Sequence, residues 1–274
     1  MQFTYMLAPI EGVSENAFRT LCYKNGADIT FTEMARVDAL ARGNKSTWDR
    51  ISLLDSTPTA IQLLALKEGS LEKFLAMFKP QEGFKGFNLN LGCPSPNIIK
   101  TGMGCAMIKR VNKTNKLVKI IKSKGYEVSI KLRLGMNLFE KQNKNYLNLI
   151  KEADADYFIV HARHGMQTYE EPADNNIYLD CVETGKAIIA NGDIKTEEQA
   201  KQLRKAGVMG VMIGRAAVKD PAIFNRIKGK HNLGHNEIRN DYLRLTETFN
   251  TPQKHKEMFL SYFENKKEFG KILI

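Results

Sequence analysis

The sequence has no apolar run of the roughly 18 to 20 residues that a membrane-spanning helix requires. Residues 1–5 carry no basic segment ahead of an apolar one, so we expect no secretory signal. Cysteine is scarce, and the four present (Cys22, Cys93, Cys105 and Cys181) are far apart and lack the spacing of metal ligands. Internal repeats and low-complexity tracts are also missing. We therefore expect a cytoplasmic protein with reduced thiols, no metal site and no membrane contact.

What is abundant is positive charge. The chain has 274 residues, of which 43% are hydrophobic, enough to bury a full core in one large domain with a small appendage. The formal net charge of +11 favours a polyanionic partner such as nucleic acid. Lysines on solvated helix faces would give the same total. Charge alone therefore leaves both interpretations open.

Short apolar segments alternate with amphipathic segments along most of the chain. Strands are predicted at residues 3–8, 29–33, 59–63, 86–91, 128–132, 157–161, 187–191 and 210–213, and helices at residues 15–25, 71–78, 115–124, 146–153, 196–206 and 221–227. The connections after the second and sixth strands show no clear helical pattern. Eight strand–helix units predict an α/β fold, a (β/α)8 TIM barrel over residues 1–229. Residues 230–274 are polar and charged, with helical spacing at 237–250 and 253–266, and predict a short C-terminal helical domain.

Polar side chains follow nearly every predicted strand, where barrel enzymes place their catalytic groups. The residues at these positions are Glu11, Glu33, Gln62, Asn90, Cys93, Lys131, Arg133, His161, Arg163, Asn191, Asp193 and Arg215. Lys131 and Arg133 share one face of their strand, so burial requires an anion to meet them. An anionic or electron-rich cofactor ring meets this need, and an internal ion pair with Glu33 or Asp193 is the alternative for one of the two cations.

Cys93 lies in a loop of fixed shape. The alternation of residues 87–91 predicts a strand that ends at Gly92, and Pro94 and Pro96 hold the chain beyond in an extended turn. The glycine-rich run 101–106 is suited to act as a mobile lid over this loop. A free thiol has a pKa of about 8.5 and is mostly protonated at neutral pH, so it can donate a proton. An inert buried thiol, or a nucleophile with His161 or His164 as base, are the alternatives.

Two glycine-containing turns indicate a phosphate site. Asn191-Gly192-Asp193 and Gly214-Arg215 follow the seventh and eighth strands, where barrels commonly hold phosphate with backbone N–H groups. Arg215 can add a bidentate contact to the same oxygens. Tight turns without a ligand would also explain the two glycines.

Taken together, these motifs resemble the tRNA-dihydrouridine synthases, from about residue 6 to 228. The resemblance rests on residues 8–13 with 18–19, 32–34, 88–94 with 102–106, 131–135, 161–163, 190–194 and 214–216. It implies an FMN-containing barrel in which NADPH reduces the flavin, the flavin passes hydride to C6 of a tRNA uracil, and Cys93 protonates C5. The implied FMN contacts are Pro9, Ile10, Glu11, Gln62, Lys131, His161, Asn191, Gly192, Asp193, Gly214 and Arg215, while Asn90 and Arg163 are expected near the flavin and the uracil.

The sequence departs from the family pattern at three places. Ile10 stands where methionine is more usual, residues 169–174 carry acids where a glycine is common, and residues 230–274 are short for the family's tRNA-binding helical bundle. One alternative function is an FMN-dependent barrel oxidoreductase of a free pyrimidine, similar to dihydroorotate dehydrogenase. Another is a tRNA-binding module that has lost catalysis. No stable protein partner is expected.

Overall fold

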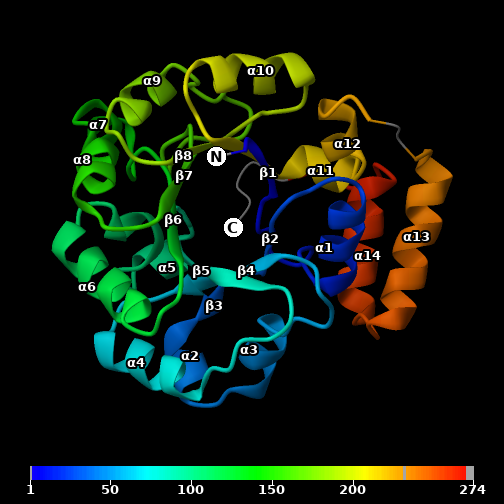
Figure 1. Cartoon of the computed structure of the whole chain (residues 1–274), viewed down its shortest axis with the longest axis horizontal. Helices are drawn as coiled ribbons and strands as arrows, with labels where there is room; N and C mark the ends of the chain where they lie inside the picture. Colours follow the sequence, from blue (N-terminus) through cyan, green and yellow to red (C-terminus); the bar gives the residue numbers. More distant parts are fainter. Residues whose placement is uncertain (1, 231–232, 270–274) are drawn as a thin grey trace.

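A closed barrel of parallel strands forms the centre of the computed structural model, which describes residues 2–230 and 233–269 (Figure 1). A parallel bridge between Met6 and Ile29 joins β1 to β2 and closes the ring. The strand order is β1-β9-β8-β7-β6-β5-β4-β2, and β3 extends the β2 edge along β4. The predicted TIM barrel is therefore confirmed. The strands are β1 (Thr4–Leu7), β2 (Thr30–Phe31), β3 (Ala35–Arg36), β4 (Thr59–Leu64), β5 (Phe84–Leu91), β6 (Val128–Leu132), β7 (Tyr157–His161), β8 (Ile188–Asn191) and β9 (Gly210–Ile213).

Helices surround the barrel on its outer side (Figure 1). Two connections without a clear helical pattern in the sequence do contain helices: α2 and α3 follow β3, and α9 follows β7. These helices have only five or six residues, too few for a periodic pattern to develop. The helices are α1 (Asn16–Lys24), α2 (Val37–Ala41), α3 (Lys45–Arg50), α4 (Glu68–Met77), α5 (Pro96–Ile99), α6 (Val111–Lys122), α7 (Leu138–Gln142), α8 (Asn145–Glu152), α9 (Ile177–Val182), α10 (Glu197–Lys205), α11 (Arg215–Lys219), α12 (Ile223–Ile227), α13 (His235–Thr248) and α14 (Gln253–Phe263), with a 3-10 helix at Gly104–Met107.

The strand register brings the predicted site residues into one layer. Asn90 on β5 is opposite Lys131 on β6, and His161 on β7 is opposite Asn191 on β8. Because residues in register on parallel strands face the same side of the sheet, these side chains share the inner face at the carboxyl ends of their strands. Apolar residues such as Ile159 and Ile189 fill the barrel below them. The core therefore forms the floor of a site that opens at the carboxyl end.

The two C-terminal helices pack against the outside of the barrel rather than standing apart from it. In Figure 1, α13 and α14 lie beside α1. The Phe259 ring is 5.1 Å from the Phe18 ring of α1 and 4.1 Å from the Tyr242 ring of α13. Residues of both helices belong to the same buried cluster as the barrel's outer core. Of the predicted helical domain, residues 231–232 and 270–274 lie outside the described residues.

Among the described helices, none combines the length and the apolar character that crossing a membrane requires.

Candidate active site

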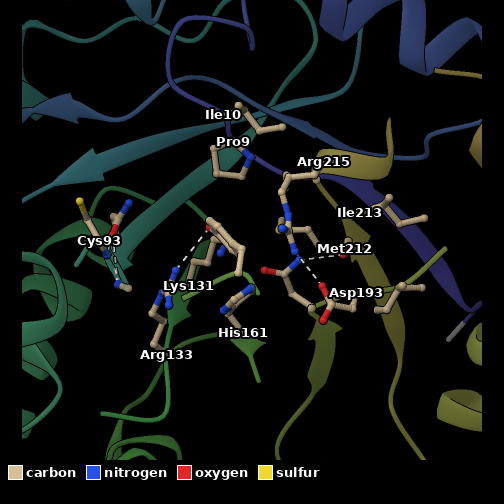
Figure 2. Close-up of a pocket in the computed structure, with 18 of the residues that line it drawn as sticks. Pro9, Ile10, Cys93, Lys131, Arg133, His161, Asp193, Met212, Ile213 and Arg215 are labelled. Atoms are coloured by element: carbon tan, nitrogen blue, oxygen red, sulfur yellow. Dashed lines mark hydrogen bonds and ion pairs between the residues drawn. The ribbon is translucent and has the colours of Figure 1, made fainter. Parts of the chain in front are cut away.

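A pocket of about 1060 Å³, including its open mouth, lies at the carboxyl ends of the strands (Figure 2). Cys93 lies at one end, Asp193 and Arg215 lie at the other, and Lys131 and His161 lie between them. The predicted site residues that line it are Pro9, Ile10, Glu11, Gln62, Asn90, Cys93, Lys131, His161, Asn191, Gly192, Asp193, Gly214 and Arg215. The register and the loops thus gather residues from every part of the barrel into one cavity.

Arg163 is the predicted site residue that does not line the pocket. Its N–H donates to the carbonyl of His161 (2.7 Å), and this tight turn ends the alternation of β7. The guanidinium is therefore directed behind the pocket wall, where it is fully buried. There it pairs with the Asp193 carboxylate and donates to the Glu171 carbonyl. Arg163 thus supports Asp193 in this structure and does not line the pocket.

The middle of the pocket carries positive charge that no protein group balances. The Lys131 side chain forms no hydrogen bond or ion pair with the described residues, and burial together with the nearby Arg133 lowers its pKa to about 7. Its expected alternative partners are engaged elsewhere, since Glu33 pairs with Arg50 (3.3 Å) and Asp193 pairs with two arginines. An anionic or electron-rich ligand is the group that this wall lacks.

His161 has one buried ring nitrogen, Nδ1, without a hydrogen-bond partner. Burial, and then the charges of Arg133 and Lys131, hold the pKa of His161 well below its ordinary value. The imidazole is therefore neutral and can donate or accept a hydrogen bond. An unpaired buried nitrogen costs free energy unless a ligand pairs with it.

Asp193 and Arg215 form the far end of the pocket. The Asp193 carboxylate accepts from Arg215 Nη2 (2.7 Å) and from the Ala173 N–H (3.1 Å). Burial opposes ionisation, but the hydrogen bonds from Arg163 and the Ala173 N–H and the charges of Arg163 and Arg215 together outweigh it and hold the pKa of Asp193 below its usual value. Gly192 has a φ of +129°, and a Cβ there would lie 3.0 Å from the Cβ of Ala173. Only glycine therefore allows this close turn, which leaves room for a ligand.

A ladder of buried amides fixes the loop that carries Cys93. The Asn90 Oδ1 accepts from the N–H groups of Gly92 (3.0 Å) and Cys93 (2.7 Å), while its Nδ2 donates to Gln62 (2.9 Å). Gln62 in turn donates to Asn88 (2.8 Å). With both ends of its amide engaged, Asn90 serves first to position Cys93.

The Cys93 thiol is held in its protonated form. Burial raises its pKa above the ordinary value, although a hydrogen bond from the backbone at Ser95 opposes this shift. The side chain packs against Leu64, Ile98 and Met103, and in Figure 2 its sulfur points away from the other labelled residues. In the part of the chain that the structure describes, neither His161 nor His164 hydrogen-bonds to Cys93, so no thiolate–imidazole pair forms.

Several pocket residues were not assigned from the sequence. Arg133 was noted as a strand-end cation, but its place at the pocket, with Nη1 donating to the His164 carbonyl (2.9 Å), comes from the structure. The Tyr169 ring lies 3.9 Å from the Arg215 guanidinium carbon and covers that end of the pocket. Met34 and Lys195 also line the cavity. An aromatic residue in a polar loop was the only sequence signal for Tyr169.

The model of the dihydrouridine synthase (Dus) family matches residues 6–274. The chain belongs to the dihydrouridine synthase family. Membership predicted from the motifs is thereby confirmed, and it makes the chain an oxidoreductase by family.

Relatives with this name come from bacteria and vertebrates. A probable tRNA-dihydrouridine synthase of Helicobacter pylori is 31% identical over 233 residues, which cover 81% of this chain and 69% of the relative. tRNA-dihydrouridine synthase B of Pseudomonas putida is 29% identical, over 90% of this chain and 71% of the relative. A tRNA-dihydrouridine(47) synthase [NAD(P)(+)]-like protein of Xenopus tropicalis is 29% identical over 81% of this chain, but only 35% of its own length is covered.

The fold also occurs outside the family. The structure of DHODH from Eimeria tenella, in complex with ferulenol, superposes with a TM-score of 0.54 over 92% of this chain and 83% of that chain. The two sequences are 12% identical, so the likeness concerns the fold alone.

Proposed function

We propose that this chain reduces uridine in tRNA to 5,6-dihydrouridine, with FMN as bound cofactor and NADPH as reductant. The observation that carries the proposal is the unpaired Lys131 and His161 in the middle of a pocket that has a protonated Cys93 at one end and Arg215 at the other. Family membership assigns the reaction class, and this arrangement matches it. The enzyme would act in the cytoplasm.

The residues present fit a flavin mononucleotide. The isoalloxazine would lie against Lys131, which lacks an electron-rich partner, and against the His161 nitrogen, which lacks a hydrogen-bond partner among the described residues. Its phosphate would lie at Gly192, Gly214 and Arg215, where close turns leave room and a guanidinium supplies charge. The neighbouring contacts are proposed to come from Pro9, Ile10, Glu11, Gln62, Asn191 and Asp193. When bound, the flavin supplies the hydride that adds to C6 of the uracil.

Cys93 is proposed to donate the proton that C5 receives. Its raised pKa keeps the proton on sulfur at neutral pH, and the nearby positive charge of Arg133 favours the thiolate that remains. Because the thiol now packs against Ile98 and Met103, donation requires a rotation about the Cα–Cβ bond toward the pocket. Asn90 holds the loop in place during this rotation.

The uracil is proposed to enter at the pocket mouth, where Arg133 and Tyr169 lie beside the flavin site. Residues 1–229 would form the catalytic domain and residues 230–274 a short region that helps to hold tRNA. The position of α14 supports this division, because a Cβ at Gly12, next to the pocket residue Glu11, would lie 3.6 Å from the Met258 side chain. Helix α14 therefore lies close to the loop that carries Glu11.

The test is to purify the chain, load it with FMN and supply NADPH with either a uridine-containing tRNA transcript or a free pyrimidine. We expect a yellow protein that forms dihydrouridine in the transcript, detected by mass spectrometry of the digested RNA, and leaves the free pyrimidine unchanged. Turnover of the free pyrimidine alone would favour the dihydroorotate-dehydrogenase-like alternative. A protein that binds no FMN would overturn the proposal.

A further inference from the structure

Positive charge is unevenly distributed along the chain. Residues 83–126 contain nine lysine and arginine residues and no aspartate or glutamate, whereas residues 230–274 contain eight basic and six acidic residues. The C-terminal helices are therefore almost neutral. The excess charge lies instead on the side of the barrel that carries α5 and α6, at the left of the barrel in Figure 1.

This basic segment continues directly from the loop of Cys93. The carbonyl of Cys93 accepts from the N–H of Cys105 (3.0 Å), so the chain folds back over the catalytic loop before α6 begins. Helix α6 then runs antiparallel to the strands, as in any (β/α)8 barrel, and its first turn lies at the same end as the pocket. Lys100, Lys109 and Arg110 are exposed at this end.

The cations at this end differ in whether a carboxylate already neutralises them. Lys109 pairs with Glu140 (2.8 Å), and Lys113 pairs with Glu68 (2.9 Å). The Lys100 side chain forms no ion pair or hydrogen bond with the described residues, and the Arg110 side chain makes only a long hydrogen bond to the Gly102 carbonyl (3.5 Å) among them. Two full charges therefore face solvent beside the pocket without an acidic partner among the described residues.

A hollow beside these cations offers space for a ligand. It is lined by Lys109, Arg110, Val111, Asn112, Lys113, Asn148 and Glu152, so that three of its lining side chains are basic and one is acidic. From Val111 to Lys116 the helix axis advances by about 7.5 Å, and Lys109 and Arg110 directly precede this helix, so the cations can contact more than one phosphate of a polymer.

We propose that the exposed cations of residues 100–116 form the surface on which the phosphate backbone of the substrate RNA docks, beside the nucleotide to be reduced. The inference rests on the proposed function for the identity of the RNA. Its own basis is charge complementarity and continuity with the Cys93 loop, because a backbone bound there lies next to a base in the pocket. Lys100 and Arg110 are expected to contribute most, since no carboxylate competes for them.

The experiment compares Lys100→Ala/Arg110→Ala with a matched control, Lys85→Ala/Lys124→Ala. The control removes two exposed cations of the same segment, but these lie at the amino end of β5 and in the turn before β6, at the opposite end of the barrel. Binding of a tRNA transcript to each FMN-loaded protein is measured by fluorescence anisotropy over a range of salt concentrations. Thermal melting checks that both variants fold.

We expect Lys100→Ala/Arg110→Ala to bind tRNA about tenfold more weakly. The negative slope of the log association constant against log salt concentration should become shallower by roughly 1.5. The control should bind like the wild type, and reduction of the flavin by NADPH should be unchanged in both variants. Equal binding by the two double variants, or a wild-type protein that binds an acidic protein but no tRNA, would overturn the inference. A wild type that binds tRNA through this surface but makes no dihydrouridine would instead overturn the proposed function alone.

Discussion

Lys131 is an amine that the fold has removed from water without giving it a partner. The sequence predicted this conflict, because two cations on one face of a barrel strand require an anion. The sequence did not predict which of the two cations finds a partner. Arg133 donates to the His164 carbonyl, whereas the Lys131 side chain has no partner among the described residues. The partner of each cation depends on loops far away in the chain, and no local pattern encodes that information.

Replacing Lys131 with methionine should stabilise the cofactor-free protein. Its pKa falls from 10.5 to about 7 on folding, so the unfolded chain binds more protons between these values and wild-type stability rises with pH across this window. The advantage of Lys131→Met should therefore be greatest near pH 7 and shrink toward pH 10, measured by chemical denaturation. Lys119→Met, on the exposed side of α6, controls for the loss of charge. An advantage that does not change with pH contradicts this account.

The position of Arg163 could not be predicted from its motif. The alternation of β7 places Arg163 on the same side as His161, but the tight turn after His161 reverses its direction. Sequence spacing cannot reveal such a turn.

Arg163→Lys should act on the flavin site and leave the RNA site intact. The planar guanidinium serves both Asp193 and the Glu171 carbonyl, and a lysine cannot make the same set of contacts. We expect weaker FMN binding with an unchanged KM for tRNA at saturating FMN, together with a loss of stability of about 3 kcal/mol. A raised KM for tRNA with normal FMN binding would contradict this expectation and mean that Arg163 acts in binding the substrate.

At the scale of the elements, periodic patterns found the longer helices and the barrel strands, and missed the short helices α2, α3, α5, α7, α9 and α11. The extended turn expected after Pro96 was wrong, because α5 begins there with proline in its first turn. Patterns also located α13 and α14, but could not show what these helices cover. Their docking depends on contacts such as Phe259 with Phe18 and Thr251 with Glu15 (3.0 Å), which join residues more than 200 positions apart. Such contacts leave no trace in the sequence of either helix alone.

His255 should make the docking of α14 dependent on pH. Its Nε2 lies 3.3 Å from the buried Glu33, and this hydrogen bond raises the pKa of His255 above its usual value of 6.5. The stabilisation is therefore fully present below pH 6.5 and is lost as the pH rises through the folded-state pKa. We expect His255→Ala to cost about 1 kcal/mol at low pH and less as the pH rises.

Denaturation curves of the wild type and His255→Ala at several pH values test this expectation. His255→Gln keeps a neutral hydrogen-bond donor, so it should lose the stabilisation seen at low pH. Residue 255 should then add no pH dependence to the stability of this variant. A destabilisation by His255→Ala that grows with pH would mean that His255 does not act as the protonated partner of Glu33.

At the scale of the whole molecule, the sequence shows the net charge, but it does not show on which side of the barrel the unbalanced cations lie. From the sequence, the short C-terminal helical region was the expected place for tRNA contacts. The structure instead places the unbalanced cations beside α6, and the C-terminal helices complete the barrel's outer core. The pocket lies between these two features, so a substrate base in the pocket can contact both the catalytic groups and the surface that holds its backbone.

The most direct test of the account is a single turnover of the FMN-loaded protein, reduced in advance and mixed with tRNA without oxygen. The wild type should form dihydrouridine as its flavin is reoxidised. Cys93→Ala should bind the same amount of FMN but form dihydrouridine about 10² to 10⁴ times more slowly, the range for loss of a general acid. Cys181→Ala, which changes a buried cysteine of α9 that does not line the pocket, should behave like the wild type. Dihydrouridine formation at the wild-type rate by Cys93→Ala would contradict the central claim.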